Sequence, residues 1–297
     1  MGTEKYPEEN VYSKFISDNG GTDNAYTTLD GTNYHFSVSN DGFDKALDMF
    51  AQFFISPLFL ESSVEKEMKA VDSEFKNSLQ SDPERFFQIF QNESNPESAF
   101  NRFTTGSLET LKKEGIVEQL KEFHRKWYSS NVMKLCIYSN RDLNEMEIVV
   151  KDLFSKVENK HVEVPNFSDP PAYSEENLGR LFKVKPVMDE NELNICFYLP
   201  CFQKDFYYEV VQYPSHVLGH EGENSLLSEL IEKNLATDNY ASFDHMLGAF
   251  SYFDINITLT EKGFDNYEEV IQIVWARIQG LKTSGPLEYV FNEYNQN

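Results

Sequence analysis

The sequence is poor in positive charge. It holds 26 lysines and arginines against 49 aspartates and glutamates in 297 residues, a formal net charge of −23 at pH 7. The phosphates of nucleic acids and the anionic surface of membranes both require a basic face on the protein, so this balance argues against nucleic acid and against membrane docking. A strongly acidic surface suits a soluble protein, a basic partner, or basic and neutral peptides.

Cysteine and long apolar runs are also scarce. The three cysteines Cys136, Cys196 and Cys201 show no C-x-x-C spacing, which disfavours a disulfide framework and a cysteine zinc site. We expect Cys136 and Cys196, which lie in apolar strand-like runs, to be buried reduced thiols, and reduced thiols indicate the cytoplasm. No run approaches the roughly 18 apolar residues of a membrane span, and the start MGTEKYPEEN has no signal-peptide core.

Segments of helical and strand-like pattern alternate along the chain, which is typical of an α+β fold. Apolar spacing predicts helices over residues 43–55, 61–79, 116–128, 143–157, 208–218, 225–233 and 267–281, and shorter ones starting near residues 8, 82 and 286. Extended runs predict strands over residues 24–28, 32–38, 132–138, 180–185, 193–199 and 250–260. The proline-containing stretch 161–177 predicts a linker between two blocks, residues 1–160 and 178–297.

Two glutamates in the predicted helix 61–79 are candidates for metal chemistry. Glu67 and Glu74 are seven residues apart, close to two helical turns, so their side chains share a face. The small or apolar neighbours Met68, Ala70 and Val71 favour at least partial burial, and such a carboxylate pair suits a metal ligand and the partner that orients it. A solvated helix face is the other interpretation.

The six histidines offer no convincing zinc pair by spacing. Only His216 and His220 stand four residues apart, with Glu221 after the second. The H-E-x-x-H motif needs its glutamate directly after the first histidine, where Val217 stands, and Gly219 weakens a helix. Packing or capping is therefore the favoured interpretation of this pair.

A series of sequence blocks in fixed order carries a resemblance to a known family: MGTEKYPEEN, SDNGGTDNAYT, GTNYHFSV, ALDMFAQFFISPLF, EMKAVDSE, WYSSN, GHEG and SLLSEL. The chain resembles the insulinase (pitrilysin) family of zinc metallopeptidases, closest to its insulysin and nardilysin branch. The resemblance implies two related insulinase-type α/β sandwich domains, both incomplete. Residues 1–160 would be the remainder of the first peptidase domain, and residues 178–297 the start of a second, non-catalytic one.

The resemblance also implies part of a zinc site. In the family, an H-x-x-E-H motif supplies two histidine ligands and the glutamate that activates water, and a glutamate from a later helix is the third ligand. The EMKAVDSE block matches that later helix, which implies that Glu74 binds Zn²⁺ and that Glu67 assists. The H-x-x-E-H motif precedes the MGTEKYP block in the family and is not in this sequence. We therefore expect a partial chain that retains no stoichiometric Zn²⁺ and no activity alone.

Two further matches imply contacts with a peptide. Asn24, Ala25 and Tyr26 match the strand to which a substrate adds as an extra strand, although a plain hairpin strand is the alternative. The GHEG block, with His220 and Gly222, matches a segment that holds the substrate's N-terminus. The expected function is zinc-dependent endopeptidase cleavage of peptides. The alternative is a non-catalytic peptide-binding chain, or a partner of the complementary half or of a complete family member.

Overall fold

The computed structural model describes residues 2–188, 190–204 and 212–294. It divides into two compact units, of which the first comprises Met1–Leu79 and Phe103–Pro165 and the second comprises Gln80–Arg102 and Asn166–Asn297. The segment of residues 80–102 thus packs with the second unit although it precedes part of the first in sequence. The expected domain boundaries near residues 160 and 178 stay a prediction.

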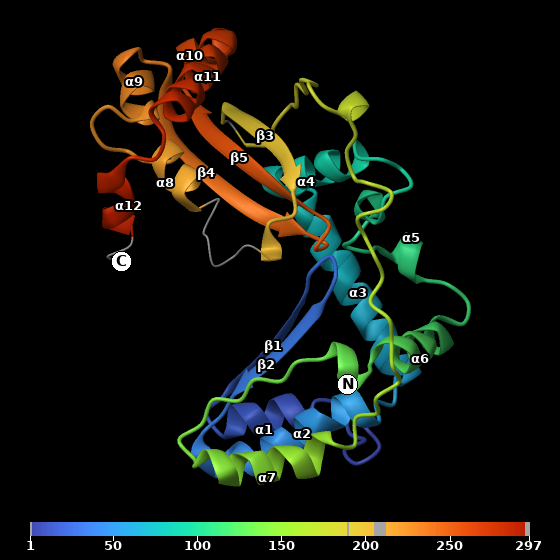
Figure 1. The fold of residues 1–297 in the computed structure, drawn as a ribbon. Helices are drawn as coiled ribbons and strands as arrows, with labels where there is room; N and C mark the ends of the chain where they lie inside the picture. The colour runs from blue at the N-terminus through green and yellow to red at the C-terminus, as the bar shows by residue number, and fades with distance from the viewer. Residues whose placement is uncertain (1, 189, 205–211, 295–297) are drawn as a thin grey trace. The chain divides into compact units, whose positions relative to one another are not determined.

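A β-hairpin and three helices form the core of the first unit. β1 (Thr22–Thr27) pairs antiparallel with β2 (Thr32–Ser37). Figure 1 shows α1 (Val11–Asp18), α2 (Phe43–Ile55) and α7 (Leu143–Phe154) side by side near this hairpin. Tyr34 and Phe36 point from β2 toward buried residues of α1 and α2, whereas Asn33 and His35 are exposed. One face of β2 is therefore half-buried, whereas every residue of β1 is exposed.

The remaining helices of the first unit include the one that carries the glutamates. α3 (Glu61–Ser78) contacts the short α5 (Leu108–Leu111), and α6 (Ile116–Trp127) follows. The structure also has four 3-10 turns among the described residues, at Asn40–Gly42, Ala99–Asn101, Ser130–Val132 and Glu175–Asn177. α3 matches the helix predicted over residues 61–79.

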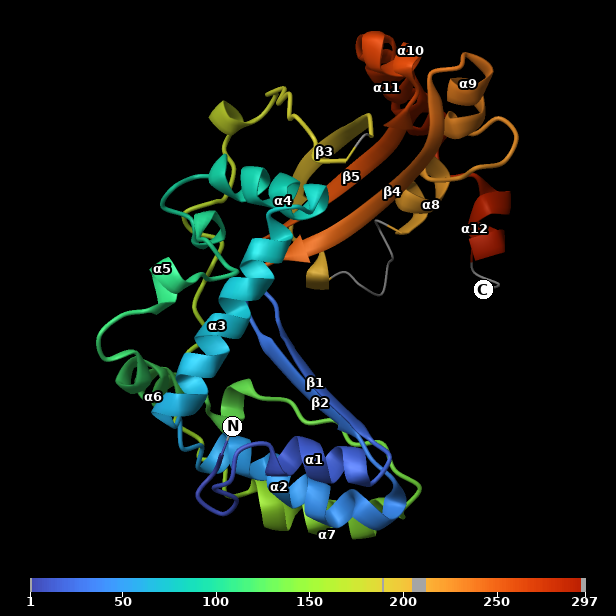
Figure 2. The same cartoon turned by 180° about the vertical axis from the view of Figure 1, so that it is seen from behind.

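The second unit contains a three-stranded antiparallel sheet. β3 (Glu192–Pro200), β5 (Phe250–Leu259) and β4 (Ala236–Met246) lie in the order β3-β5-β4. One face packs on α8 (Gln212–Leu218), α9 (Leu226–Glu232) and α11 (Tyr267–Ser284), as Figures 1 and 2 show. Ile255 and Ile257 are fully buried in this core. The short helices α10 (Glu261–Asp265) and α12 (Glu288–Tyr294) complete the unit.

An aromatic cluster on the other face of this sheet explains why residues 80–102 belong to the second unit. Phe100, which follows α4 (Asp82–Asn92), is fully buried, and its ring lies 5.1 Å from that of Phe250 in β5. Phe90 in α4 stacks on Tyr173, with ring centroids 5.1 Å apart. The Asp82 carboxylate accepts hydrogen bonds from the backbone N–H groups of Val187 and Met188.

Most of the predicted elements are confirmed, and two strands are wrong. The helix predicted over 208–218 is confirmed from Gln212, and its first residues lie outside the described part of the chain. Residues 132–138 and 180–185 are not strands. Their β-prone side chains predict an extended chain, but a strand also needs a partner with which to exchange hydrogen bonds. Cys136 and Cys196 are exposed, so the expectation of buried thiols is also wrong.

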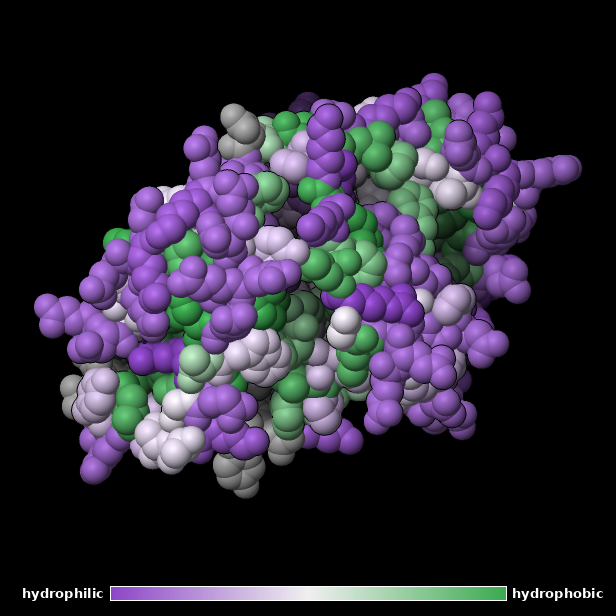
Figure 3. Space-filling model, turned by 90° about the horizontal axis from the view of Figure 1, so that it is seen from above, coloured by the Kyte–Doolittle hydropathy of each residue, from purple (hydrophilic) through white to green (hydrophobic). Residues whose placement is uncertain are grey.

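The described surface is largely polar. Figure 3 shows hydrophilic side chains over most of the face it presents, with hydrophobic ones exposed in patches between them. Within the described ranges, no helix combines the length and the apolar character that crossing a bilayer requires.

Candidate metal and peptide-binding site

The two glutamates lie on the open side of α3. Val64 is buried and Met68 and Val71 are half-buried on one face, whereas Glu67 and Glu74 are both exposed. The expectation of at least partial burial for the glutamates is therefore wrong. The apolar side chains lie on a face about a quarter-turn around the helix from the two glutamates, so they do not cover the carboxylates. Neither glutamate makes a hydrogen bond or ion pair within the described part of the chain, so both carboxylates are available to a ligand.

A third carboxylate of α3, Asp72, has a different environment. Asp72 is only 7% exposed, accepts a hydrogen bond from the backbone N–H of Leu108 at 2.9 Å, and lies 2.6 Å from the ammonium of Lys76. The Leu108 hydrogen bond and then Lys76 hold the pKa of Asp72 below its usual range. Sequence reasoning missed this residue, although an aspartate four residues before a lysine on a helix is a recognisable pair.

The strand predicted to bind peptide has a free edge. Among the described residues β1 pairs with β2 alone, and Asn24, Ala25 and Tyr26 are all exposed. Because Thr28 N–H donates to Gly31 O at the turn, the alternation of the ladder directs the backbone groups of Ala25 away from β2. The N–H of Ala25 instead donates to the side-chain oxygen of Asn24 at 2.8 Å. The backbone of a peptide that adds as a strand can accept the Ala25 N–H in place of the Asn24 side chain.

The His220 segment forms a tight turn after α8. Gly222 N–H donates to His220 Nδ1 at 2.9 Å, so the neutral ring carries its proton on Nε2. A Cβ at Gly222 would lie 2.4 Å from the His220 ring, so a larger residue here would displace that ring from its present place. The rings of His216 and His220 meet edge to face with centroids 5.6 Å apart.

A cavity of about 470 Å³ opens beside this turn. It is lined by Gln212, Ser215, His216, Gly219, His220, Glu221, Tyr240 and Ala241. Tyr240 and Ala241 of β4 complete the lining because α8 packs on β4. Burial, and then the charges of Asp254 and Glu192, raise the pKa of Tyr240, so its hydroxyl stays protonated at neutral pH and can donate a hydrogen bond.

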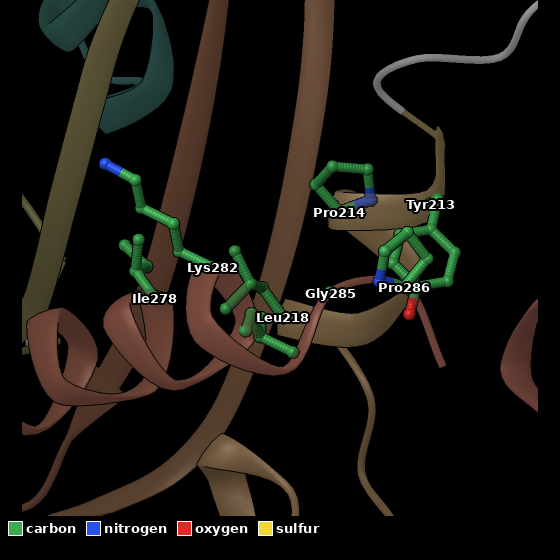
Figure 4. A pocket seen from close by; sticks show the side chains of 8 residues that line it. Tyr213, Pro214, Leu218, Ile278, Lys282, Gly285 and Pro286 are labelled. Carbon is green, nitrogen blue, oxygen red and sulfur yellow. The ribbon is translucent and has the colours of Figure 1, made fainter. Parts of the chain in front are cut away.

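A second, more apolar pocket of about 360 Å³ lies in the same unit, between α8 and the end of α11. Figure 4 shows Tyr213, Pro214 and Pro286 grouped at one end, and the amine of Lys282 directed away from them. The Tyr213 hydroxyl accepts a hydrogen bond from Leu287 N–H at 2.7 Å. The described residues that line this pocket include no carboxylate and no histidine.

The residues that are present fit one zinc ligand and not a complete zinc site. A catalytic zinc ion takes three protein ligands and leaves a position for water. No three His, Cys, Asp or Glu side chains gather in metal-binding geometry within the described ranges. Glu74 offers an exposed oxygen donor without a competing partner, and Glu67 is its neighbour on the same face. The predicted peptide strand lies in the first unit with these glutamates, and His220 and Gly222 lie in the second.

The fold places the chain among pitrilysin-type structures. The crystal structure of pitrilysin matches with a TM-score of 0.89 at 27% sequence identity, covering 99% of this chain and 32% of that chain. The family model "Insulinase (Peptidase family M16)" matches residues 1–98, and the model "Peptidase M16 inactive domain" matches residues 116–297. The chain therefore belongs to the insulinase family, peptidase family M16.

Curated relatives agree with this assignment. The chain is 40% identical over 299 aligned positions to the insulin-degrading enzyme of Homo sapiens, covering 99% of this chain and 29% of that enzyme. It is also 40% identical to the putative zinc protease mug138 of Schizosaccharomyces pombe, covering 99% of this chain and 31% of that protein. The chain thus spans about three tenths of the length of these relatives. The α+β fold expected from the resemblance is confirmed.

Proposed function

We propose that this chain is part of a zinc-dependent endopeptidase that cleaves peptides. The observation that carries the proposal is the pair of exposed glutamates on α3, Glu67 and Glu74, neither of which has a partner in the described part of the chain. A carboxylate without a competing hydrogen bond can bind a cation with little reorganisation of the protein. The 40% identity to a putative zinc protease supports the same assignment.

The two glutamates take different roles. Glu74 supplies one carboxylate ligand to Zn²⁺, and ligands from outside the described residues complete the site. A zinc ion held there would supply Lewis-acid chemistry, namely polarisation of the scissile carbonyl and a lower pKa for a bound water molecule. Seven residues of helix rise by about 10 Å, so Glu67 is placed to orient a neighbouring ligand rather than to share the same ion.

The free edge of β1 takes the substrate as an added strand. The outward backbone groups of Ala25 pair with the peptide once its N–H leaves the Asn24 side chain. Tyr26, which is 56% exposed, presents its ring on the face shared with His35, 6.2 Å away between centroids. These contacts select extended peptides through the backbone and contribute side-chain preference only at Tyr26 and His35.

The cavity beside His220 takes the positively charged N-terminus of the peptide. Glu221 and the Tyr240 hydroxyl lie in its lining, and the net charge of −23 favours cationic groups in general. Gly222 N–H holds the His220 ring through Nδ1 at the edge of this cavity. The free thiols are compatible with a cytoplasmic enzyme. The expected partner is the part of the family's peptidase architecture that complements this chain.

The test compares Glu74→Gln with Glu65→Gln, another exposed glutamate of α3, in the protein that carries this chain. Zinc content by elemental analysis and hydrolysis of a fluorogenic peptide are measured for both. The proposal predicts that Glu74→Gln loses most of the bound zinc and the hydrolysis, whereas Glu65→Gln keeps both. Equal zinc content in the two variants would overturn the role of Glu74. A wild-type protein that binds peptide without zinc or hydrolysis would instead support the non-catalytic alternative.

A further inference from the structure

We propose that Asp72 is a positioning residue, which fixes the rotation of α3 about its axis and thereby places the carboxylate of Glu74. The proposal rests on the proposed function, because it assigns Asp72 a purpose only if Glu74 binds the metal. It concerns residues of the first unit alone, namely α3 and the loop of residues 103–108 that leads into α5.

Asp72 attaches α3 to this loop through a partly buried hydrogen bond. One carboxylate oxygen accepts the N–H of Leu108 at 2.9 Å, and the residue is 7% exposed. A charged acceptor on a backbone donor is among the stronger hydrogen bonds in proteins. Lys76 pairs with the other oxygen at 2.6 Å, but its side chain is 67% exposed, so the ion pair contributes little by itself.

The loop is a firm anchor because it is itself held at several points. Ser107 and Thr110 cap the start of α5 reciprocally, and Ser107 is buried. Gly106 adopts a positive φ of 87°, and a Cβ at this position would lie 3.3 Å from Val71 of α3. The rings of Phe75 and Phe103 meet edge to face with centroids 5.3 Å apart. The hydrogen bond of Asp72 therefore joins α3 to a loop that is itself held in place; Figure 2 labels α3 and α5, the two helices concerned.

The direction of Asp72 on α3 determines how its hydrogen bond to the loop affects Glu74. Residues two apart on a helix differ by about 200° in direction, so Asp72 points nearly opposite to Glu74. The hydrogen bond of Asp72 therefore holds α3 on the side opposite to Glu74, and Glu74 stays exposed. A rotation of α3 by about 20° would move a carboxylate about 5–6 Å from the axis by roughly 2 Å. That displacement equals a whole zinc–oxygen bond of about 2.0–2.2 Å, whereas functional sites tolerate only about 0.5 Å.

The test uses three variants in the protein that carries this chain. Asp72→Ala removes the acceptor. Asp72→Asn keeps an oxygen that can accept the Leu108 N–H and removes the charge, and Lys76→Met removes only the ion pair. Zinc affinity of the metal-free protein is measured by titration with zinc in a competing chelator, and hydrogen exchange is measured over residues 61–78 and 103–111.

The expected result is a loss of zinc affinity of about tenfold in Asp72→Ala, the lower end of the range for groups bonded directly to a ligand, because Asp72 acts on Glu74 only through α3. Asp72→Asn should recover most of that affinity, and Lys76→Met should stay within twofold of wild type. Faster exchange at residues 103–111 in Asp72→Ala should accompany the loss.

A merely structural role would give a different pattern. If Asp72→Ala lowers the unfolding temperature and speeds exchange but leaves zinc affinity within twofold, the positioning role is overturned. Glu74→Gln is included to separate the two proposals. If Glu74→Gln itself leaves zinc affinity unchanged, the proposed function fails at its ligand, whereas the exchange data still report whether Asp72 holds the loop.

Discussion

Replacing Phe100 with alanine tests why residues 80–102 pack with the second unit. Phe100 is fully buried, and its ring centroid lies 5.1 Å from that of Phe250 and 5.3 Å from that of Phe90. Truncating a buried phenylalanine to alanine costs about 3–5 kcal/mol, through lost burial and the cavity that remains. The Gln91 side chain donates to the backbone carbonyl of Phe100 at 3.2 Å, and this hydrogen bond survives the change. The stability lost in Phe100→Ala therefore measures the contribution of the aromatic cluster.

Hydrogen exchange by mass spectrometry locates the effect along the chain. A loss of about 3–5 kcal/mol corresponds to exchange about 150- to 5,000-fold faster where opening follows global unfolding of the unit. We expect this acceleration in peptides from α4 and β5, and little change in peptides from α1 and α2. Phe123→Ala is the control, because Phe123 is 57% exposed in the first unit. Faster exchange in α1 and α2, with β5 unchanged, would refute the placement of residues 80–102.

Three further predictions concern local chemistry in each unit. Hydrogen bonds from Arg141 hold the pKa of Asp44 below its usual range; this stabilisation is present above the unfolded value of about 3.9 and is lost as pH falls through the folded value. Asp44→Asn should therefore cost at most about 1 kcal/mol at pH 7, and the difference from wild type should vanish in acid denaturation curves. Gly263→Ala should destabilise the protein by about 1–3 kcal/mol because its Cβ would overlap the backbone carbonyl of Leu235. Gly280→Ala, with open space around it, should stabilise the protein by about 0.4–1 kcal/mol. Urea unfolding measures both. Ala25→Pro should weaken peptide binding at least tenfold, as measured by anisotropy, because it removes an outward N–H donor.

Each of these predictions has a contrary result. A pH-independent effect of Asp44→Asn would show that the ion pair does not report the titration of that carboxyl. Equal urea midpoints for the two glycine variants would contradict the close approach at Gly263. Unchanged peptide affinity in Ala25→Pro, with the hairpin intact by circular dichroism, would show that peptides do not add to the edge of β1.

The sequence predicted best those elements that carry their own local signal. The apolar spacing over residues 43–55 predicted α2 with the bounds that the structure has, and Pro83 indicated the first turn of α4. The runs 132–138 and 180–185 failed because strand formation depends on a partner that a local pattern does not reveal. The association of Phe100 with Phe250 joins residues 150 positions apart and could not follow from periodicity.

The candidate site was predictable in its residues but not in its surroundings. A spacing of seven placed Glu67 and Glu74 on one face of α3, as the structure has them. Their exposure was not predicted, because the neighbouring apolar side chains cover a different face of the same helix. The role of Asp72 depends on a hydrogen bond to Leu108, 36 residues away, and only the folded chain brings that donor to the carboxylate.

The most direct test of the account is the position of zinc in crystals of the protein that carries this chain. Anomalous difference maps collected on both sides of the zinc absorption edge locate the ion without reference to activity. The account predicts one peak about 2.0–2.2 Å from a carboxylate oxygen of Glu74, with Glu67 beside the site but not bound to the ion. A zinc peak that does not involve Glu74, or fully loaded protein with no peak near α3, would contradict it.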